Sequence, residues 1–197
     1  MGLSMETKGK DKPVAVVIYG MVAVGKLTVA RALQKEFGYR LTHNHLINDL
    51  VWSIFDRGTL EGNSLIERLR YELYEEAVRQ GVNVIITHCY SHDYVSPTGL
   101  SDPDYLKTLE EKLQDAGART LFIHLQADNQ TLLERVQGES RHEYRKLTDV
   151  EKMSEYLNDK SLDVRTSASV KNNVVIDNTN MSVEEVVRLV AQEIGLI

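Results

Sequence analysis

A glycine-rich segment that ends in a lysine is the part of the sequence best suited to chemistry. It runs from Gly20 to Lys26 and reads GMVAVGK, with four residues between its first glycine and a closing Gly25-Lys26 pair. The two glycines allow the backbone to curl. Successive N–H groups, including those of Ala23 and Val24, then point into one concavity at a helix start, which favours phosphate oxygens. The pattern predicts a phosphate-binding P-loop whose lysine reaches the β and γ phosphates of a nucleotide, with an ordinary strand-to-helix turn as the alternative.

The residue after this lysine departs from the usual P-loop pattern. A Ser or Thr hydroxyl normally binds magnesium at that position, whereas this chain has Leu27 followed by Thr28. Thr28 lies about 100° further around the helix, so it suits an α-phosphate better than the missing metal ligand. We expect both residues in a site for ATP accompanied by Mg²⁺, and the sequence assigns no protein ligand to the metal.

Two histidines flank Asn44 at the end of the second expected strand. A histidine near its ordinary pKa of about 6.5 accepts a hydroxyl proton at neutral pH, so His43 and His45 are both candidates for a general base. Asn44 is expected to contact the same acceptor molecule. The alternative is that Asn44 or His45 caps the following helix and that the histidines satisfy local hydrogen bonds.

Two arginines lie close together on the helix before the third expected strand. Arg68 and Arg70 are candidates for holding an anionic group of the acceptor, and we expect at least one of them to be only a surface charge.

Hydrophobic spacing places these residues on alternating strands and helices. Parallel strands need crossover connections, so this alternation predicts a parallel sheet covered on both faces. Ser182 followed by Glu185 predicts a capping box at the start of the last helix. The expected strands are 14–19, 39–42, 82–87, 119–125 and 174–176, and the expected helices are 26–37, 46–55, 64–80, 105–116, 129–136, 149–162 and 182–194.

Size and composition favour a single folded domain. The chain has 197 residues, which fits one domain or one with a small insert. Hydrophobic residues make up 42% and charged residues 26%, so a core can close without disulfides, and disordered chains and disulfide scaffolds are excluded. We expect residues 1–12, which are polar, to form a flexible extension and residues 13–197 to form the domain.

Net charge and cysteine content limit the partners and the compartment. The formal net charge is −6, whereas a protein that tracks nucleic acid needs a basic excess, so we expect no nucleic-acid partner. The single cysteine fits a reducing cytoplasm. No segment approaches 18 uninterrupted apolar residues and the start lacks a signal-peptide core, so we expect a cytoplasmic protein with no membrane partner. The oligomeric state is left open between a monomer and a weak dimer.

On these residues the chain resembles the small P-loop kinases, the group that holds shikimate kinase, gluconate kinase and chloramphenicol phosphotransferase. The resemblance covers roughly residues 13–195 and is strongest to small bacterial ATPase-type proteins with a VGKLT loop. It implies a three-layer P-loop NTPase fold, with a five-stranded parallel sheet in the order 2-3-1-4-5, helices on both faces and a small lid at about 138–148. The segments that carry the resemblance are Val24 to Thr28, His43 to His45 and Lys146 to Asp149.

The resemblance also implies roles for three arginines and an asparagine. Arg145 would close over the γ-phosphate from the lid, and Arg141 is a second candidate there. Arg135, in the helix before the lid, would stack on adenine, and Asn178 lies where these kinases have their adenine-binding loop. A solvated basic turn is the alternative for the arginines, and a plain strand-to-helix turn is the alternative for Asn178.

The chain departs from shikimate kinase at the acceptor side. His43 and His45 stand where that enzyme has a D-x-D motif, and the segment His88-Cys89-Tyr90 stands where it has three glycines. We therefore expect an acceptor other than shikimate, contacted by His88 and Tyr90. The third strand ends in Thr87-His88, without the acidic residue expected for a second magnesium contact.

The functional hypothesis is transfer of the γ-phosphate of ATP to a hydroxyl of a small molecule. The backbone of residues 20–26 would hold the phosphates, and Lys26 and Arg145 would offset charge on the transferred group. His45 or His43 would orient or deprotonate the acceptor. The alternatives are a nucleotide-binding protein with weak or no catalysis and an antibiotic-modifying phosphotransferase, while a polynucleotide 5′-kinase fits an acidic chain less well.

Overall fold

The structure is a computed structural model that describes residues 12–138, 147–159 and 162–196. The expected N-terminal extension lies outside the described residues except for Lys12. Arg141, Arg145 and most of the expected lid at 138–148 also lie outside them.

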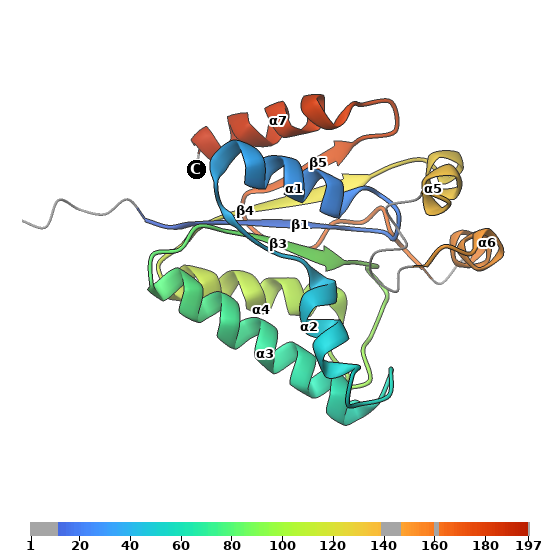
Figure 1. Cartoon of the computed structure of the whole chain (residues 1–197), viewed down its shortest axis with the longest axis horizontal. Helices are drawn as coiled ribbons and strands as arrows, with labels where there is room; N and C mark the ends of the chain where they lie inside the picture. Colours follow the sequence, from blue (N-terminus) through green and yellow to red (C-terminus); the bar gives the residue numbers. More distant parts are fainter. Residues whose placement is uncertain (1–11, 139–146, 160–161, 197) are drawn as a thin grey trace, which may run out of the picture.

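Five strands form one parallel sheet with the order β2-β3-β1-β4-β5, so the predicted architecture is confirmed (Figure 1). Every neighbouring pair is parallel, and the glycine-rich segment follows the central strand. The strands are β1 Val14–Gly20, β2 Arg40–Thr42, β3 Val84–Cys89, β4 Arg119–Gln126 and β5 Asn173–Asp177.

Helices cover both faces of the sheet. Figure 1 shows α1 (Lys26–Phe37) and α7 (Val183–Leu196) on one face. The other face carries α2, α3 and α4, while α5 and α6 lie beyond the carboxyl ends of the strands. The bounds of these five helices are α2 Asn44–Val51, α3 Leu60–Arg79, α4 Asp102–Asp115, α5 Asn129–Val136 and α6 Val150–Asn158.

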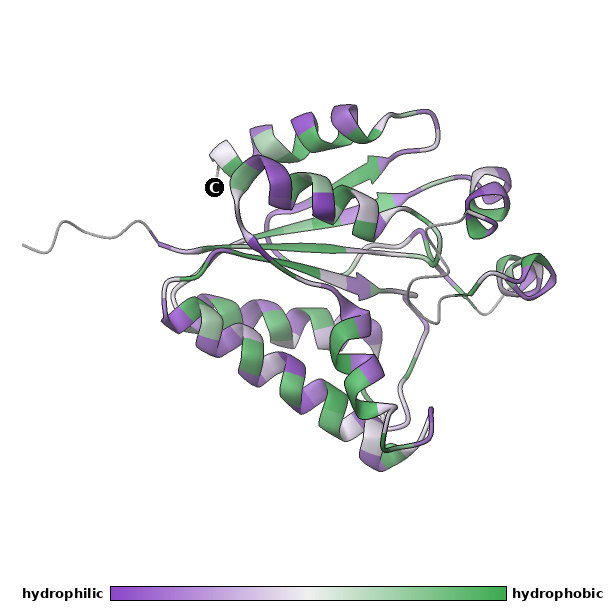
Figure 2. Cartoon of the chain, viewed as in Figure 1, coloured by the Kyte–Doolittle hydropathy of each residue, from purple (hydrophilic) through white to green (hydrophobic). Residues whose placement is uncertain are grey.

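The central strand is buried on both sides, which explains its continuous apolar run. Val16 and Ile18 pack in the cluster beneath α1 and α7, whereas Val17 and Tyr19 pack in the cluster beneath α3 and α4. Figure 2 shows the same pattern as apolar strands between helices whose apolar stripes face the sheet. Two independent cores therefore hold β1, and the segment that follows it, in a fixed position.

Several predicted helix boundaries were wrong because capping residues lay inside segments interpreted as loops. Thr59 caps α3 by accepting a hydrogen bond from the N–H of Gly62, so this helix begins four residues before the predicted start. Ser101 caps α4 in the same way, so this helix begins three residues before the predicted start at residue 105. The helix predicted over 46–55 spans 44–51, and the one predicted over 149–162 ends at residue 158.

Other local predictions are confirmed. Helices α1 and α5 have the predicted bounds. At the start of α7, the N–H of Ser182 donates to a carboxylate oxygen of Glu185 at 2.8 Å, and the N–H of Glu185 donates to the Ser182 hydroxyl at 3.2 Å. This reciprocal pair is the predicted capping box.

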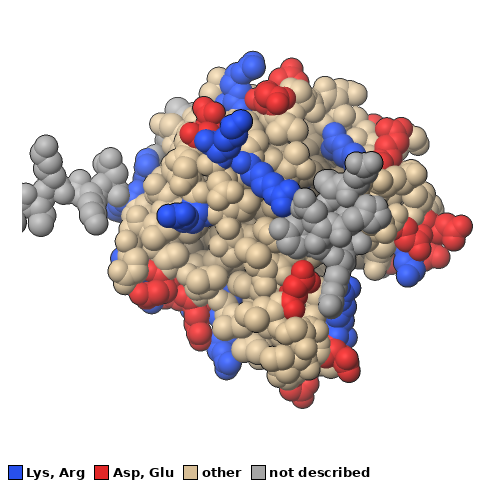
Figure 3. Space-filling model, in the orientation of Figure 1, with Lys and Arg blue, Asp and Glu red and all other residues tan. Residues whose placement is uncertain are grey.

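The described surface is mixed in charge. On the face drawn in Figure 3, the acidic and basic side chains of the described residues are interspersed and form no continuous basic stripe. Within the described ranges, none of the helices combines the length and the apolar character needed to cross a bilayer.

Candidate active site

The segment from Gly20 to Lys26 connects β1 directly to α1 and requires its glycines. Gly20 has φ 142°, and a Cβ added there would lie 2.3 Å from the carbonyl oxygen of Leu125 on β4. Gly25 forms the N-cap of α1 with φ 99°. Ala23, between them, also has a positive φ of 65°. The loop is therefore a tightly curled strand-to-helix connection at a helix N-terminus, the geometry that favours anionic oxygens.

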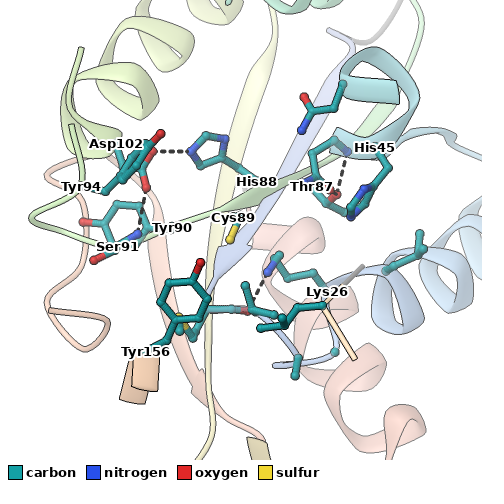
Figure 4. Close-up of a pocket in the computed structure, with 18 of the residues that line it drawn as sticks. Lys26, His45, Thr87, His88, Cys89, Tyr90, Ser91, Tyr94, Asp102 and Tyr156 are labelled. Carbon is teal, nitrogen blue, oxygen red and sulfur yellow. Dashed lines mark hydrogen bonds and ion pairs between the residues drawn. The ribbon is translucent and has the colours of Figure 1, made fainter. Parts of the chain in front are cut away.

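Lys26 holds its ammonium group over this loop. Its Nζ donates to the carbonyl oxygens of Gly20 and Met21, each at 2.7 Å (Figure 4). The positive charge is thus fixed at the mouth of the loop by two neutral acceptors. Phosphate oxygens would be stronger acceptors for the same group, because a charge-assisted hydrogen bond exceeds one to a carbonyl.

A chain of hydrogen bonds joins the loop after β5 and helix α5 to the phosphate loop. The buried side chain of Asn178 donates to the carbonyl oxygen of Val24 at 2.9 Å. Arg135 donates to the side-chain and main-chain oxygens of Asn178 at 2.9 and 3.0 Å. Two residues that the sequence placed in the nucleotide site are thereby brought together beside the P-loop.

The described residues do not supply the usual protein ligands for magnesium. Leu27 and Thr28 both line the cavity, but Leu27 offers no oxygen where the usual hydroxyl would stand. Among the described residues, no group of three or more His, Cys, Asp or Glu side chains is arranged to hold a metal ion. Magnesium in such sites is held largely by substrate phosphates and water.

One cavity of about 1090 Å³ extends from the P-loop to the wall formed by α2, α3 and the start of α4. This volume is slightly above the ~300–1,000 Å³ typical of small-molecule sites, as expected for a cavity that would hold two substrates. The same cavity is lined by Asn44, His45, Arg70, His88 and Tyr90. All five were expected to contact the acceptor or act on it, so the fold gathers them around one space.

His43 and Arg68 lie elsewhere. His43 is the buried N-cap residue of α2 and is not among the residues that line the cavity. The side chain of Arg68 is 66% exposed and lies 3.9 Å from Glu72, one turn further along α3. An exposed pair of this kind contributes little to stability.

Arg70 is a buried cation in the cavity wall, with 8% of its surface exposed. Its Nη2 donates to the side-chain oxygen of Asn48 at 2.8 Å, and its guanidinium lies 5.8 Å from the ring centroid of Tyr105. Its buried Nε has no hydrogen-bond partner among the described residues. A buried donor without a partner is costly, so this wall is suited to an anionic ligand.

The start of α2 is attached to the end of β3. The hydroxyl of Thr87 donates to the side-chain oxygen of Asn44 and accepts from the Asn44 N–H, both at 3.2 Å. The interpretation that Asn44 or His45 caps this helix was wrong, because His43 is the N-cap residue and the other two lie in the first turn. This contact positions His45 at the cavity.

Sequence reasoning missed the carboxylate that holds His88. The Nε2 of His88 lies 3.1 Å from one oxygen of Asp102, and the other oxygen accepts from the Ser91 N–H at 2.9 Å (Figure 4). The imidazole also stacks on Tyr105 at 4.5 Å. Burial lowers the pKa of His88, and the charge of Asp102 opposes that shift. The pair Ser101-Asp102 is a helix-start signal that could have placed this carboxylate.

Tyr90 continues the backbone beside the P-loop. Its N–H donates to the carbonyl oxygen of Gly20 at 3.1 Å, and its hydroxyl lies 2.9 Å from Nδ1 of His92. The ring of Tyr90 is buried against the edge of Tyr19 and lines the cavity. This segment therefore both contacts the phosphate loop and forms part of the cavity wall.

A phosphate loop after the central strand of a 2-3-1-4-5 parallel sheet defines a P-loop NTPase fold, and comparison with known proteins agrees. The profile of the AAA domain family matches residues 16–157, which include the P-loop and most of the sheet. Since this is more than half of the chain, the chain belongs to that family. No curated protein matches it in sequence.

Solved structures show the same fold as that of small P-loop kinases. A protein from Chloroflexus aurantiacus is 18% identical, with a TM-score of 0.66 and coverage of 92% of this chain and 98% of that one. A sugar kinase from Janibacter sp. is 16% identical, with a TM-score of 0.62 and coverage of 93% and 95%. A gluconokinase from Sinorhizobium meliloti is also 16% identical, with a TM-score of 0.57 and coverage of 93% of both chains. At these identities the likeness concerns the fold.

Proposed function

We propose that the chain transfers the γ-phosphate of ATP to a hydroxyl group of a small, anionic acceptor. The observation that carries this proposal is that a single cavity joins the P-loop to a wall bearing Arg70 and His88. Donor and acceptor would therefore meet in one enclosure without leaving the protein.

At the nucleotide end, the N–H groups of residues 20–26 would hold the phosphates and Lys26 would exchange its carbonyl partners for phosphate oxygens. Charge developing on the transferred group is stabilised best by donors that are already in place. Arg135 and Asn178 would form the wall of the cavity beside the base and ribose of ATP. The roles proposed for Arg141 and Arg145 concern residues outside the described part of the chain.

At the acceptor end, Arg70 would hold a carboxylate or phosphate of the acceptor. Asn44 and Tyr90 would bound the pocket, and His45 and His88 are the two imidazoles that line it. Binding the acceptor through an anion distant from its reacting hydroxyl fixes the orientation of that hydroxyl toward the P-loop. Such positioning accounts for much of the rate enhancement in phosphoryl transfer.

The test is phosphate transfer from radiolabelled ATP to pools of sugars, sugar acids, nucleosides and aminoglycosides. Lys26→Ala should reduce transfer by at least about 100-fold, because removal of one preorganised charge from a phosphoryl-transfer site has effects of this order. Lys35→Ala, in the last turn of the same helix and exposed, is the matched control and should transfer at the wild-type rate. Equal turnover by both variants would refute the proposal.

A second candidate, a nucleotide-binding protein with little catalysis, is favoured by Leu27 at the position of the usual magnesium ligand. Titration calorimetry separates the two candidates. Binding of ATP with equal affinity in the presence and absence of magnesium, together with no acceptor phosphorylated, supports the second. Transfer to any acceptor supports the first.

A further inference from the structure

His88 lies one strand away from the start of the phosphate loop. In the register of β1 and β3, Tyr19 pairs with His88 and Gly20 pairs with Cys89. Adjacent strands are about 4.8 Å apart. The charge of Lys26 is close enough to affect the titration of His88. The imidazole therefore lies in the wall of the cavity that Lys26 and Arg70 also line.

The imidazole of His88 is fixed in orientation from two sides. Its Nε2 lies 3.1 Å from Asp102, which is itself held by the Ser91 N–H and by its place in the first turn of α4. Stacking on Tyr105, with 13° between the ring planes, fixes the rotation of the imidazole. His88 and Asp102 are 6% and 8% exposed, so neither has room to reorient.

This arrangement determines which ring nitrogen is available. A carboxylate only accepts hydrogen bonds, so the proton of the neutral imidazole lies on Nε2. The other nitrogen, Nδ1, then carries a lone pair. Nδ1 has no hydrogen-bond partner among the described residues and keeps some accessible surface, on a residue that is 6% exposed and lines the cavity.

We propose that His88 is the general base that accepts the proton of the acceptor hydroxyl at Nδ1, and that Asp102 is the positioning residue that holds His88 in this tautomer. This inference rests on the proposed phosphotransferase function and extends it. The general base is then His88 on β3, paired with a carboxylate on α4, and not His43 or His45.

In the step, the acceptor hydroxyl loses its proton to Nδ1 of His88 while its oxygen forms a bond to the γ-phosphorus. The bond between that phosphorus and the bridging oxygen breaks, and this oxygen keeps the electron pair as ADP leaves. His88 becomes an imidazolium whose charge faces Asp102, which lowers the cost of carrying the proton. The proton then passes to solvent when the products leave.

The charges around His88 suit a base that is neutral before the reaction. Burial lowers the pKa of His88, as do Arg70 from α3 and Lys26 from α1, whereas Asp102 from α4 raises it. The imidazole is therefore unprotonated at neutral pH. The rate should fall on the acid side, at a pH below the ordinary histidine value of about 6.5.

The experiment compares His88→Gln, Asp102→Asn and His45→Gln in transfer of phosphate from labelled ATP to the acceptor pool. His88→Gln retains an amide that can donate to Asp102 but removes the base, so kcat should fall about 100-fold or more while the Kd for ATP changes less than about threefold. Lys35→Ala, exposed on α1 and outside the cavity, is the control and should keep the wild-type rate, whereas His45→Gln tests the other imidazole that lines the cavity and should lower kcat by less than His88→Gln does. A large loss in His45→Gln together with an active His88→Gln would overturn the proposal.

Asp102→Asn separates a positioning role from a purely structural one. Removal of the negative charge eliminates the effect that raises the pKa of His88, so the acid limb of the kcat–pH profile should move to lower pH. Lower kcat with an unmoved limb would refute the role of Asp102.

Ring ¹⁵N chemical shifts give a readout that needs no acceptor. In the wild-type chain at neutral pH, His88 should be protonated at Nε2 and not at Nδ1, and the opposite tautomer would exclude Nδ1 as the base. If the wild-type chain phosphorylates nothing, the proposed function fails. If it transfers phosphate and His88→Gln is equally fast, only the present inference fails.

Discussion

At the scale of single residues, the site depends on positions where one residue type is required. Gly20 combines a positive φ with a carbonyl oxygen 2.3 Å from where a side chain would begin, so the central strand can enter the loop only through glycine. His88 and Arg70 illustrate the same point for buried polar groups, because each needs a particular partner in order to remain inside the wall.

Gly20→Ala should lower the free energy of unfolding by about 2–4 kcal/mol, because it adds a clash with Leu125 to an unfavourable φ. Gly117→Ala is the matched control. Gly117 has φ 101° but nothing within 4 Å of the added Cβ, so its cost should be about 1 kcal/mol. Urea unfolding measures both variants, and equal losses would show that the clash at Gly20 is relieved.

His124 should give the fold a dependence on pH. Burial is the main cause that lowers its pKa to about 4, with smaller contributions from Arg165 and Lys26. The unfolded chain binds the proton near the ordinary value of about 6.5, so stability is complete above that pH and is lost as the pH falls toward 4. The loss from this group should be on the order of 2 kcal/mol.

Unfolding by urea at a series of pH values, for the wild-type chain and for His124→Gln, measures this dependence. The variant keeps a polar side chain near Ser167 but does not titrate. Its stability should decline less than that of the wild-type chain between pH 6.5 and 4. Parallel curves would assign the decline to other groups, including His88, whose pKa is lowered in the same direction.

At the scale of elements, the phosphate loop is stabilised by segments that are distant in sequence. Asn178 follows β5 and yet its side chain bonds the carbonyl oxygen of Val24, while Arg135 from α5 holds Asn178 in place. The nucleotide end of the cavity is thus a junction of three elements at the carboxyl ends of the strands.

Asn178→Ala should loosen this junction. Loss of its hydrogen bonds leaves the carbonyl oxygen of Val24 and the guanidinium of Arg135 without those partners, which costs about 1–3 kcal/mol of stability. The affinity for ATP should weaken by roughly tenfold, because about 1.4 kcal/mol corresponds to that factor. Asn180→Ala, exposed in the same turn, is the control and should bind ATP as the wild-type chain does, measured by calorimetry. Unchanged affinity in both variants would remove the junction from nucleotide binding.

The sequence predicted some elements well and others poorly, for physical reasons. The spacing of apolar residues predicted the bounds of α1 and α5 correctly, because each helix ends at a clear change in that spacing. The start of α3 was missed, since Gly62 and Asn63 are common in loops and obscured the cap at Thr59. Caps are decided by one hydrogen bond, which periodicity does not reveal.

The same reasoning applies to the site. The two arginines on α3 could be distinguished, because Arg70 follows the buried Ile66 by one turn and precedes the buried Tyr74 by another, whereas Arg68 does not share that face. The pairing of His88 with Asp102 could not be derived from periodicity. The two residues are separated by an irregular segment that has no repeating pattern, so their approach depends on tertiary structure.

At the scale of the whole molecule, the parallel sheet places side chains from many parts of the chain around the carboxyl ends of its strands. Residues of α1, α2, α3, β3 and α5 line the same cavity, although they lie between positions 26 and 135 of the sequence. The membership in the AAA domain family and the likeness to sugar kinase structures concern this framework.

The contact between Asn178 and Val24 also has a consequence for synthesis. The two residues are 154 positions apart, so the ribosome makes the phosphate loop well before it makes the asparagine that supports it. A nascent chain that ends before β5 carries the whole GMVAVGK segment and still lacks the amide that holds it. Tight nucleotide binding should thus be acquired only after Asn178 has been made and has packed against the loop.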